Sequence, residues 1–332
     1  LFDDKGELNG DHSGMTLLKR LLEQVDDPVL IVEGDDLGAS SRYRTAAMSQ
    51  VKPNDTRVVT FDPWAALNYY MAKKASHFTF PKVGNFVWYN LAEESDKTTR
   101  AIHAQAFARF PTLCNSANTE QEVRRDLTEF CGPATASRAA LMGAPLGVDV
   151  PELERKEPGG WPVVLWPGMW TFARKRPQLW LSIMGTVAAR RNVRAIMRLN
   201  PQAKMDQFPP TPPAWLQFEE LAPKGRYFEL LHETDVMLAT SEMESYGLAY
   251  LEALAAGVVV LLPDLPWARA IVPDSYPYLY SSRDEAVAQM MVIVSDVEAA
   301  RGRISAVPGW VRLWHSTEMF DEAFVEWLSH IG

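Results

Sequence analysis

The chain has few of the residues that build cross-linked or metal-centred proteins. Only two cysteines, Cys114 and Cys131, and six histidines occur in 332 residues. The cysteines have no paired spacing and no histidine cluster beside them, which argues against a disulfide framework or a zinc site. We interpret both as small buried side chains in a reducing compartment.

Long hydrophobic runs and an excess of positive charge are also missing. The longest apolar stretches, such as residues 258–262, are strand-sized and too short for a membrane span. The first ten residues, LFDDKGELNG, lack the basic and apolar regions of a secretory signal. With 33 basic and 42 acidic residues, the net charge of -9 disfavours a surface made mainly for polyanions. We expect a cytoplasmic protein with no integral membrane association.

Short apolar or β-branched runs alternate with helical patterns along most of the chain. This alternation is typical of an α/β protein with parallel sheets. We expect strands over residues 28–33, 57–61, 85–89 and 112–115 of the first half, and 163–166, 193–198, 216–219, 235–240 and 258–262 of the second. Leucine spacing in TLLKRLLEQ predicts a helix over 15–24, and another is expected over 120–130.

Two proline-rich stretches interrupt these patterns. PELERKEPGG, residues 151–160, is charged and aperiodic, which indicates a linker between two domains. QFPPTPP, residues 207–213, is expected to be a surface loop, because proline lacks an amide donor. We therefore place one domain at 1–150 and the other at 151–316, and expect a C-terminal helix over about 317–332 to pack back on the first.

The segment SEMESYGLAYLEALAAGVVVLLPD, residues 241–264, carries the clearest chemical pattern. An apolar strand ends at Thr240, a polar loop follows, a helix starts near Tyr246 or Gly247, and another strand begins after Gly257. Ligands of open parallel sheets bind at the carboxyl ends of the strands. A helix that starts there directs its free amides and positive dipole end at the ligand, which suits a diphosphate.

Two carboxylates flank this helix start. Glu244 precedes the helix, and Glu252 lies about one and a half turns inside it. Each can accept two hydrogen bonds from sugar hydroxyls, and Gly247 lets the backbone approach a ligand closely. A plain βαβ unit with two solvated glutamates would explain an isolated pair, but the joint order of strand, Glu, Gly, Glu, small-residue helix and strand is more specific. The segment predicts a nucleotide-sugar site.

The same segment resembles the donor-binding motif of retaining glycosyltransferases of the GT-B fold. In that motif seven residues separate two glutamates, and a run similar to EAMACGxPVV follows. Glu244 and Glu252 match the spacing and LEALAAG matches the run, while Val258-Val259 stands where the family often has proline. The resemblance implies two Rossmann-like domains with parallel sheets facing a cleft, the first on the acceptor side and the second binding the donor.

The resemblance also implies roles for single residues. Glu244 would contact the donor hexose and take part in catalysis, and Glu252 would bind the nucleotide ribose. The backbone around the helix start would meet the donor phosphates; its residues are Ser245, Tyr246, Gly247 and Leu248.

Cations for the diphosphate are expected after the first strand of the second half. VVLWPGMWTFARKRPQLWL, residues 163–181, is similar to the family's strand, Gly-Arg, short loop and Lys-Gly. Gly168 matches the glycine, and Arg174 or Lys175 falls at the lysine, whereas Met169 replaces the arginine and cannot hold a phosphate bidentately. Arg174 and Lys175 are catalytic and donor-binding candidates, and Arg198 joins the donor-binding set.

Weaker similarities follow in the first half, in the family's order. GDHSG, residues 10–14, resembles a glycine-bearing loop and makes Gly14 a donor-binding candidate. TLCNSANTEQEVRRDL, residues 112–127, and GAPLGVD, residues 143–149, resemble a strand with its helix and the interdomain stretch, with Leu146 in place of asparagine. FVWYN puts Tyr89 and Asn90 where the family often has a histidine, and Asn90 is taken as a catalytic candidate.

The resemblance implies transfer of a sugar from a UDP- or GDP-sugar to an acceptor hydroxyl, with retained configuration. The leaving diphosphate would help to deprotonate the acceptor, so the protein mainly positions the reactants and stabilises charge. Neither a cofactor nor a metal is expected, because adjacent aspartates such as Asp35-Asp36 lack an Asp-X-Asp spacing.

Three alternatives stay open. One is a nucleotide-sugar epimerase or a phosphorylase on a similar scaffold, and another is a degenerate nucleotide-sugar-binding protein, which Met169 and the missing histidine favour. The third is a phage-type enzyme that glycosylates hydroxymethylated DNA bases. Its basis is a cluster of basic and aromatic residues, for which a solvated face is the simpler explanation: Arg42, Arg44, Lys73, Lys74, Trp64, Tyr69 and Tyr70.

Overall fold

The computed structural model describes residues 13–31, 44–77, 80–91, 94–151, 160–168, 172–200, 208, 211–220 and 224–332. The chain divides into two compact units. The first comprises Leu1–Leu146 and Thr317–Gly332, and the second comprises Gly147–Ser316. The division thus falls a few residues before the stretch expected to be a linker, most of which lies outside the described residues.

The first unit is built on a parallel sheet in the order β3-β4-β5-β6, with a separate parallel pair β1-β2. Its strands are β1 (Val29–Ile31), β2 (Arg44–Ala46), β3 (Arg57–Thr60), β4 (Lys82–Val87), β5 (Thr112–Cys114) and β6 (Leu141–Gly143). Its helices are α1 (Ser13–Glu23), α2 (Pro63–His77), α3 (Lys97–Arg109), α4 (Ala117–Cys131), α5 (Pro133–Arg138) and α13 (Thr317–Ser329), with a 3-10 turn at Met48–Gln50.

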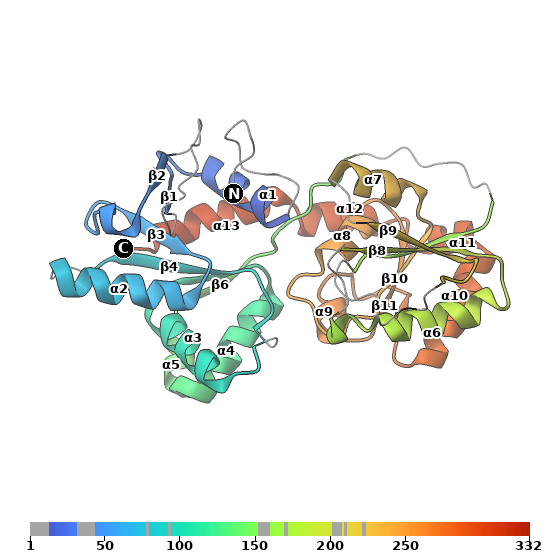
Figure 1. Cartoon of the computed structure of the whole chain (residues 1–332), viewed down its shortest axis with the longest axis horizontal. Helices are drawn as coiled ribbons and strands as arrows, with labels where there is room; N and C mark the ends of the chain where they lie inside the picture. Colours follow the sequence, from blue (N-terminus) through green and yellow to red (C-terminus); the bar gives the residue numbers. More distant parts are fainter. Residues whose placement is uncertain are drawn as a thin grey trace. The chain divides into compact units, whose positions relative to one another are not determined.

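Helices cover both faces of this sheet (Figure 1). Strand residues alternate between the faces. Phe86 and Leu113 pack against α1 and α13, whereas Val87 and Cys114 pack against α3 and α4. At Gly84 an added Cβ would lie 2.4 Å from Cδ1 of Ile331, so only glycine lets the end of the chain approach β4 this closely. The C-terminal helix is therefore part of the core of the first unit.

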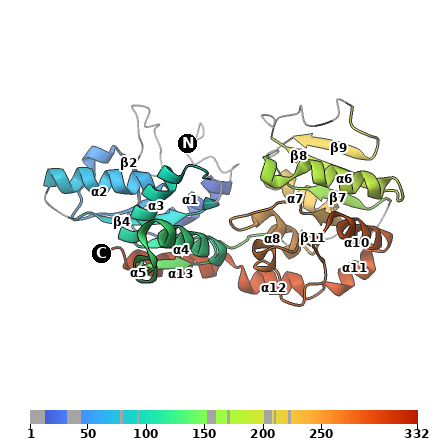
Figure 2. The same ribbon diagram turned by 90° about the horizontal axis from the view of Figure 1, so that it is seen from below.

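The second unit has one parallel sheet in the order β12-β11-β10-β7-β8-β9, with β9 at an edge (Figure 2). Its strands are β7 (Val163–Trp166), β8 (Arg194–Leu199), β9 (Leu216–Glu220), β10 (Val236–Leu238), β11 (Val259–Pro263) and β12 (Leu279–Tyr280). Its helices are α6 (Pro177–Ala188), α7 (Lys224–Glu233), α8 (Leu248–Ala255), α9 (Pro266–Arg269), α10 (Arg283–Ser295), α11 (Val297–Arg303) and α12 (Val307–Trp314), with a 3-10 turn at Ala173–Lys175.

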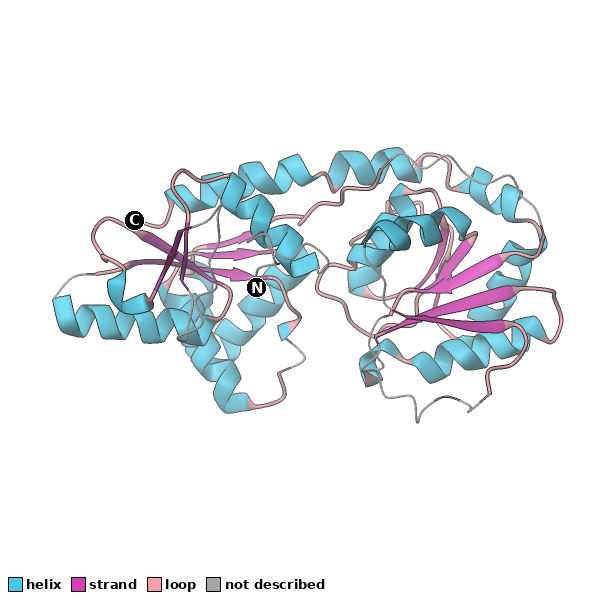
Figure 3. Ribbon diagram, turned by 45° about the horizontal axis from the view of Figure 1, so that its top comes forward, coloured by secondary structure: helices cyan, strands magenta, loops and turns pink. Residues whose placement is uncertain are grey.

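The α/β class with parallel sheets is confirmed, and Figure 3 shows the helices around each sheet. Some boundaries differ from the predicted ones. The strand expected over 85–89 is β4 at Lys82–Val87, so Tyr89 and Asn90 follow the strand instead of ending it. Gly143 ends β6, and the amide of Leu146 still donates to the carbonyl of Asn115, so the first part of GAPLGVD belongs to the first unit. Within the described residues, every helix is too short or too polar to cross a bilayer.

Candidate functional site

Gly247 marks the junction between the loop after β10 and helix α8. It caps the helix with φ 75° and ψ 34°, a left-handed conformation that side chains disfavour. An added Cβ would also lie 3.3 Å from Cδ1 of Ile271. Glycine therefore fixes the direction in which α8 leaves the loop, with the amino end of the helix at the carboxyl edge of the sheet.

A second loop, between β7 and α6, is tied to the first one. Since β7 and β10 are neighbours in the parallel sheet, the loops after them meet at one edge. The hydroxyl of Thr240 donates to the carbonyl oxygen of Lys175 at 2.8 Å, and the amide of Glu242 donates to the carbonyl of Arg174 at 2.8 Å. These two hydrogen bonds hold Lys175 in a defined place beside the α8 junction.

Lys175 and Glu244 form an ion pair at the carboxyl ends of β7 and β10. Nζ of Lys175 lies 2.5 Å from Oε1 of Glu244, and both side chains are mostly buried. A charge-assisted bond of this kind is stronger than a neutral one. An ammonium group has three donors, so Lys175 can keep this bond and still donate to an anion. Two separate sequence motifs predicted these residues as candidates, and the structure places their side chains in contact.

Glu252 lies inside α8 and is 5% exposed. Burial raises the pKa of its carboxyl from 4.5 to about 7, although Lys224, a hydrogen bond with Tyr227 and the charge of Arg198 act in the opposite direction. The guanidinium of Arg198 stacks on the ring of Tyr227 at 4.3 Å, and its burial lowers its own pKa. Arg198 therefore belongs to the surroundings of Glu252.

Sequence reasoning did not find Lys224, Tyr227 or His315. The hydroxyl of Tyr246 lies 3.0 Å from Nδ1 of His315 and accepts a hydrogen bond from the amide of Gly147 at 3.0 Å. Burial lowers the pKa of His315 to about 4, so the imidazole is neutral near pH 7. No local pattern relates these residues to the motif, because they meet it only through the fold. The phenol of Tyr246 is therefore engaged within the protein.

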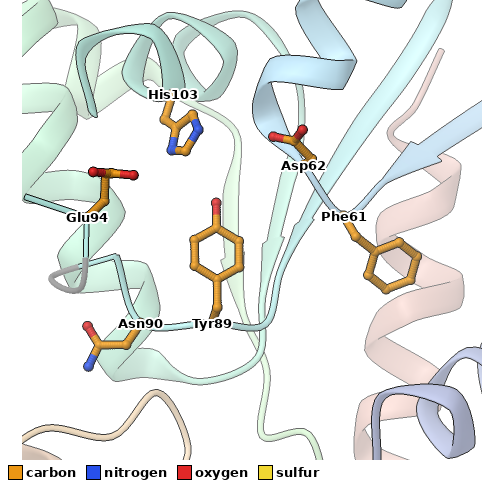
Figure 4. A pocket seen from close by; sticks show the side chains of 6 residues that line it. All are labelled: Phe61, Asp62, Tyr89, Asn90, Glu94 and His103. Carbon is orange, nitrogen blue, oxygen red and sulfur yellow. The ribbon is translucent and has the colours of Figure 1, made fainter. Parts of the chain in front are cut away.

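The first unit has a pocket of its own, with a volume of about 340 Å³. It lies at the carboxyl ends of β3 and β4, and its side chains are shown in Figure 4: Phe61, Asp62, Tyr89, Asn90, Glu94 and His103. Asn90, the catalytic candidate of the first half, is 2% exposed and lines this pocket. His103 also lines the pocket, although no motif of the sequence pointed to it.

No protein-family model matches the sequence, and no curated protein matches it either. Solved structures do match its fold. A sucrose-phosphate synthase from Thermosynechococcus elongatus gives a TM-score of 0.70 at 13% identity, over 99% of this chain and 98% of that chain. The lipopolysaccharide outer core galactosyltransferase WaaB gives 0.64 at 12% identity, over 97% and 96%. Anabaena HepE in complex with UDP-glucose gives 0.62 at 13% identity, over 82% and 78%.

The chain has the GT-B fold. The first two of these likenesses extend over nearly all of both chains, so they include both units. At such low identities the likeness defines the fold, and the chemistry of this GT-B chain rests on its own residues.

The remaining candidates are placed as follows. Gly14 lies in the first turn of α1 in the first unit, and Ser245 and Leu248 flank the α8 junction. At Gly168, which follows β7, an added Cβ would lie 2.6 Å from the Trp166 indole, so a larger residue would displace that ring. Met169 lies outside the described residues. Arg174 places its guanidinium over the ring of Phe172 at 5.2 Å.

The basic and aromatic cluster of the first unit does not form the exposed stacking face expected for nucleic acid. Tyr69 and Tyr70 are 1% and 6% exposed, and Nζ of Lys73 donates to the carbonyl of Ser49. Lys74 lies over the Tyr70 and Phe80 rings, Arg44 pairs with Asp27, and Arg42 lies outside the described residues. Trp64 is 44% exposed, but the buried rings of Tyr69 and Tyr70 cannot stack on bases, so two of the three rings of this cluster give no support for a DNA acceptor.

Proposed function

We propose that this chain is a glycosyltransferase that moves a sugar from a nucleotide diphosphate sugar to an acceptor hydroxyl. The observation that carries the proposal is the meeting of Lys175, Glu244 and the start of α8 at one edge of the second sheet. A cation, a carboxylate and a helix amino end together suit a sugar joined to a diphosphate. HepE, which shares the fold, has been crystallised with UDP-glucose.

The roles follow from the chemistry of each group. The α8 amino end and Lys175 bind the diphosphate, with Arg174 as a second cation, and the backbone of Ser245, Tyr246, Gly247 and Leu248 lies beside it. Glu244 accepts hydrogen bonds from the hexose hydroxyls, and Glu252 accepts them from the ribose. Arg198 supports Glu252 by its charge. Gly168 permits close approach of the backbone to the donor, and Gly14 stays a donor-binding candidate from the sequence.

The proposed reaction retains the configuration of the sugar. The bond from the anomeric carbon to the diphosphate oxygen breaks, and the bond from that carbon to the acceptor oxygen forms on the same face. The acceptor proton goes to the departing phosphate oxygen, so no strong protein base is required. Lys175 and the α8 dipole stabilise the charge on the leaving group, and Asn90 positions the acceptor. The donor is a UDP- or GDP-sugar, and the reaction needs neither a cofactor nor a metal.

Calorimetric titration with UDP-, GDP-, ADP- and TDP-sugars tests donor binding. We expect saturable binding of at least one of them, and Glu244→Gln should weaken it by about 10- to 100-fold, the effect of losing one charged hydrogen bond. Glu242→Gln is the matched control, because Glu242 is exposed, lies two residues away, and its side chain pairs with Arg176 at 3.5 Å. The proposal is wrong if no nucleotide sugar binds or if the two variants behave alike.

Product analysis separates transfer from the alternatives. A transferase forms product only with an acceptor, whereas an epimerase converts the donor alone and a binding protein does neither. The anomeric proton coupling of the product, measured by NMR, reports whether configuration is retained.

A further inference from the structure

The first-unit pocket combines hydrogen-bonding groups from three segments that converge at one sheet edge. Asp62 follows β3, Tyr89 follows β4, and His103 comes from α3. In Figure 4 the hydroxyl of Tyr89 points into a space bordered by His103, Asp62 and Glu94. At about 340 Å³ the pocket is at the small end of the range for ligand pockets.

Both carboxylates keep one oxygen for a ligand. Oδ1 of Asp62 accepts a hydrogen bond from the amide of Trp64 at 2.9 Å. Oε1 of Glu94 accepts one from the amide of Asp96 at 2.8 Å. Within the described part of the chain, no donor reaches the second oxygen of either group. None of the six lining residues is a lysine or an arginine. The pocket therefore offers hydrogen-bond acceptors in a negative environment.

His103 adds a polar atom whose hydrogen-bonding capacity is not used. The side chain is 9% exposed, and Nδ1 is buried with no hydrogen-bond partner among the described residues. Burial lowers the pKa of the imidazole, so it is neutral near pH 7 and gives the pocket no positive charge. A buried polar atom without a partner is costly, which favours a ligand that completes its hydrogen bond.

A metal site does not explain the polar side chains of this pocket. Among the described residues, no three His, Cys, Asp or Glu side chains lie close enough to share one ion. The polar groups of the pocket can instead form hydrogen bonds with a ligand that carries several hydroxyls on a ring.

We propose that this pocket binds an uncharged, polyhydroxylated ligand about the size of one sugar ring. Asp62 and Glu94 accept hydrogen bonds from its hydroxyls, His103 completes the set, and the aromatic ring of Tyr89 borders the pocket. The two carboxylates repel phosphate and carboxylate groups at short range. If the proposed function holds, this ligand is the acceptor, and its class is a neutral sugar or polyol instead of a phosphorylated sugar or DNA.

Binding is tested on the full chain without nucleotide. Methyl glucoside, methyl galactoside and methyl mannoside are titrated by saturation-transfer NMR and calorimetry, beside glucose 6-phosphate and glucuronic acid. We expect at least one neutral glycoside to bind, and the two anions to bind at least about tenfold more weakly. The proposal is overturned if no neutral glycoside binds, or if an anion binds as well or better.

Two variants locate the binding. Glu94→Gln keeps an oxygen for the amide of Asp96 and removes the charge, and Asp62→Asn does the same for the amide of Trp64. Each variant should bind the neutral glycoside more weakly and discriminate less against glucose 6-phosphate. Asp55→Asn, at an exposed carboxylate that does not line the pocket, should change neither. Equal effects of all three variants would show that the ligand binds elsewhere.

The outcome is distinguishable from that of the donor test. Glycoside binding with no nucleotide-sugar binding would support the pocket and reject the transferase. Nucleotide-sugar binding with no neutral glycoside binding would support the transferase and reject the proposed ligand of the pocket.

Discussion

Among single residues, Glu252 has the strongest conflict between burial and charge in the candidate site. Its carboxyl is buried, near the positive charges of Lys224 and Arg198 and the negative charge of Asp149. Burial outweighs the attraction, so the folded state favours the protonated acid. A nucleotide ribose that donates hydrogen bonds to this carboxylate would favour the ionised form.

This conflict predicts a pH dependence of stability. Because the folded pKa of about 7 lies above the ordinary 4.5, the stabilisation by Glu252 is complete below 4.5 and is lost as the pH rises through 7. Between about pH 5 and pH 8, the wild-type chain should lose up to about 3 kcal/mol more unfolding free energy than Glu252→Gln. Urea unfolding at both pH values measures the difference.

Glu220→Gln serves as the control at an exposed glutamate of the same unit. It should leave the pH dependence of the wild-type chain unchanged. A Glu252→Gln curve parallel to the wild-type curve would show that Glu252 is ionised throughout.

At the scale of elements, α8 depends on the backbone conformation at its first turn. The helix has eight residues and begins directly after the left-handed Gly247. Its amino end can face a diphosphate only while that conformation holds, because the peptide dipoles follow the helix axis.

Gly247→Ala should destabilise the second unit by about 1–2 kcal/mol, the cost of a side chain in the left-handed region. The Cβ contact with Ile271 at 3.3 Å adds to this cost. Differential scanning calorimetry and nucleotide-sugar titration check both stability and donor binding. Gly309→Ala in α12, where a Cβ meets nothing within 4 Å, should instead stabilise by up to about 1 kcal/mol. Equal effects of the two substitutions would contradict the role of Gly247.

At the scale of the whole molecule, the last helix returns to the core of the first unit. Phe320, Phe324 and Trp327 of α13 pack with Leu17 and Phe86, and the rings of Phe86 and Phe320 are 5.6 Å apart. The first unit therefore consists of two segments of chain that are distant in sequence.

Phe320→Ala should destabilise the first unit by about 3–5 kcal/mol, the usual cost of removing a buried aromatic ring. Hydrogen exchange followed by mass spectrometry should show faster exchange in β4 and β5, with β7 and β10 unchanged. Val325→Ala, at an exposed position on the same helix, should have little effect. Faster exchange in β7 or β10 would contradict the assignment of α13 to the first unit alone.

Local patterns in the sequence predicted the α/β class, most strands, and the loop and helix around Glu244 and Gly247. These features depend on hydrophobic periodicity and on the conformational freedom of glycine, which neighbouring residues determine. The short strands β2, β6 and β12 were missed, because two or three residues give little periodicity.

The tertiary structure decided which distant side chains meet. The pairing of Lys175 with Glu244, the environment of Glu252 and the bond between Tyr246 and His315 all join residues from separate segments. The same is true of Asp62, Glu94 and His103 in the first-unit pocket. The sequence by itself determined where each chemical group lies along the chain, but burial and electrostatic coupling depend on distances in space, which only the packing of strands and helices defines.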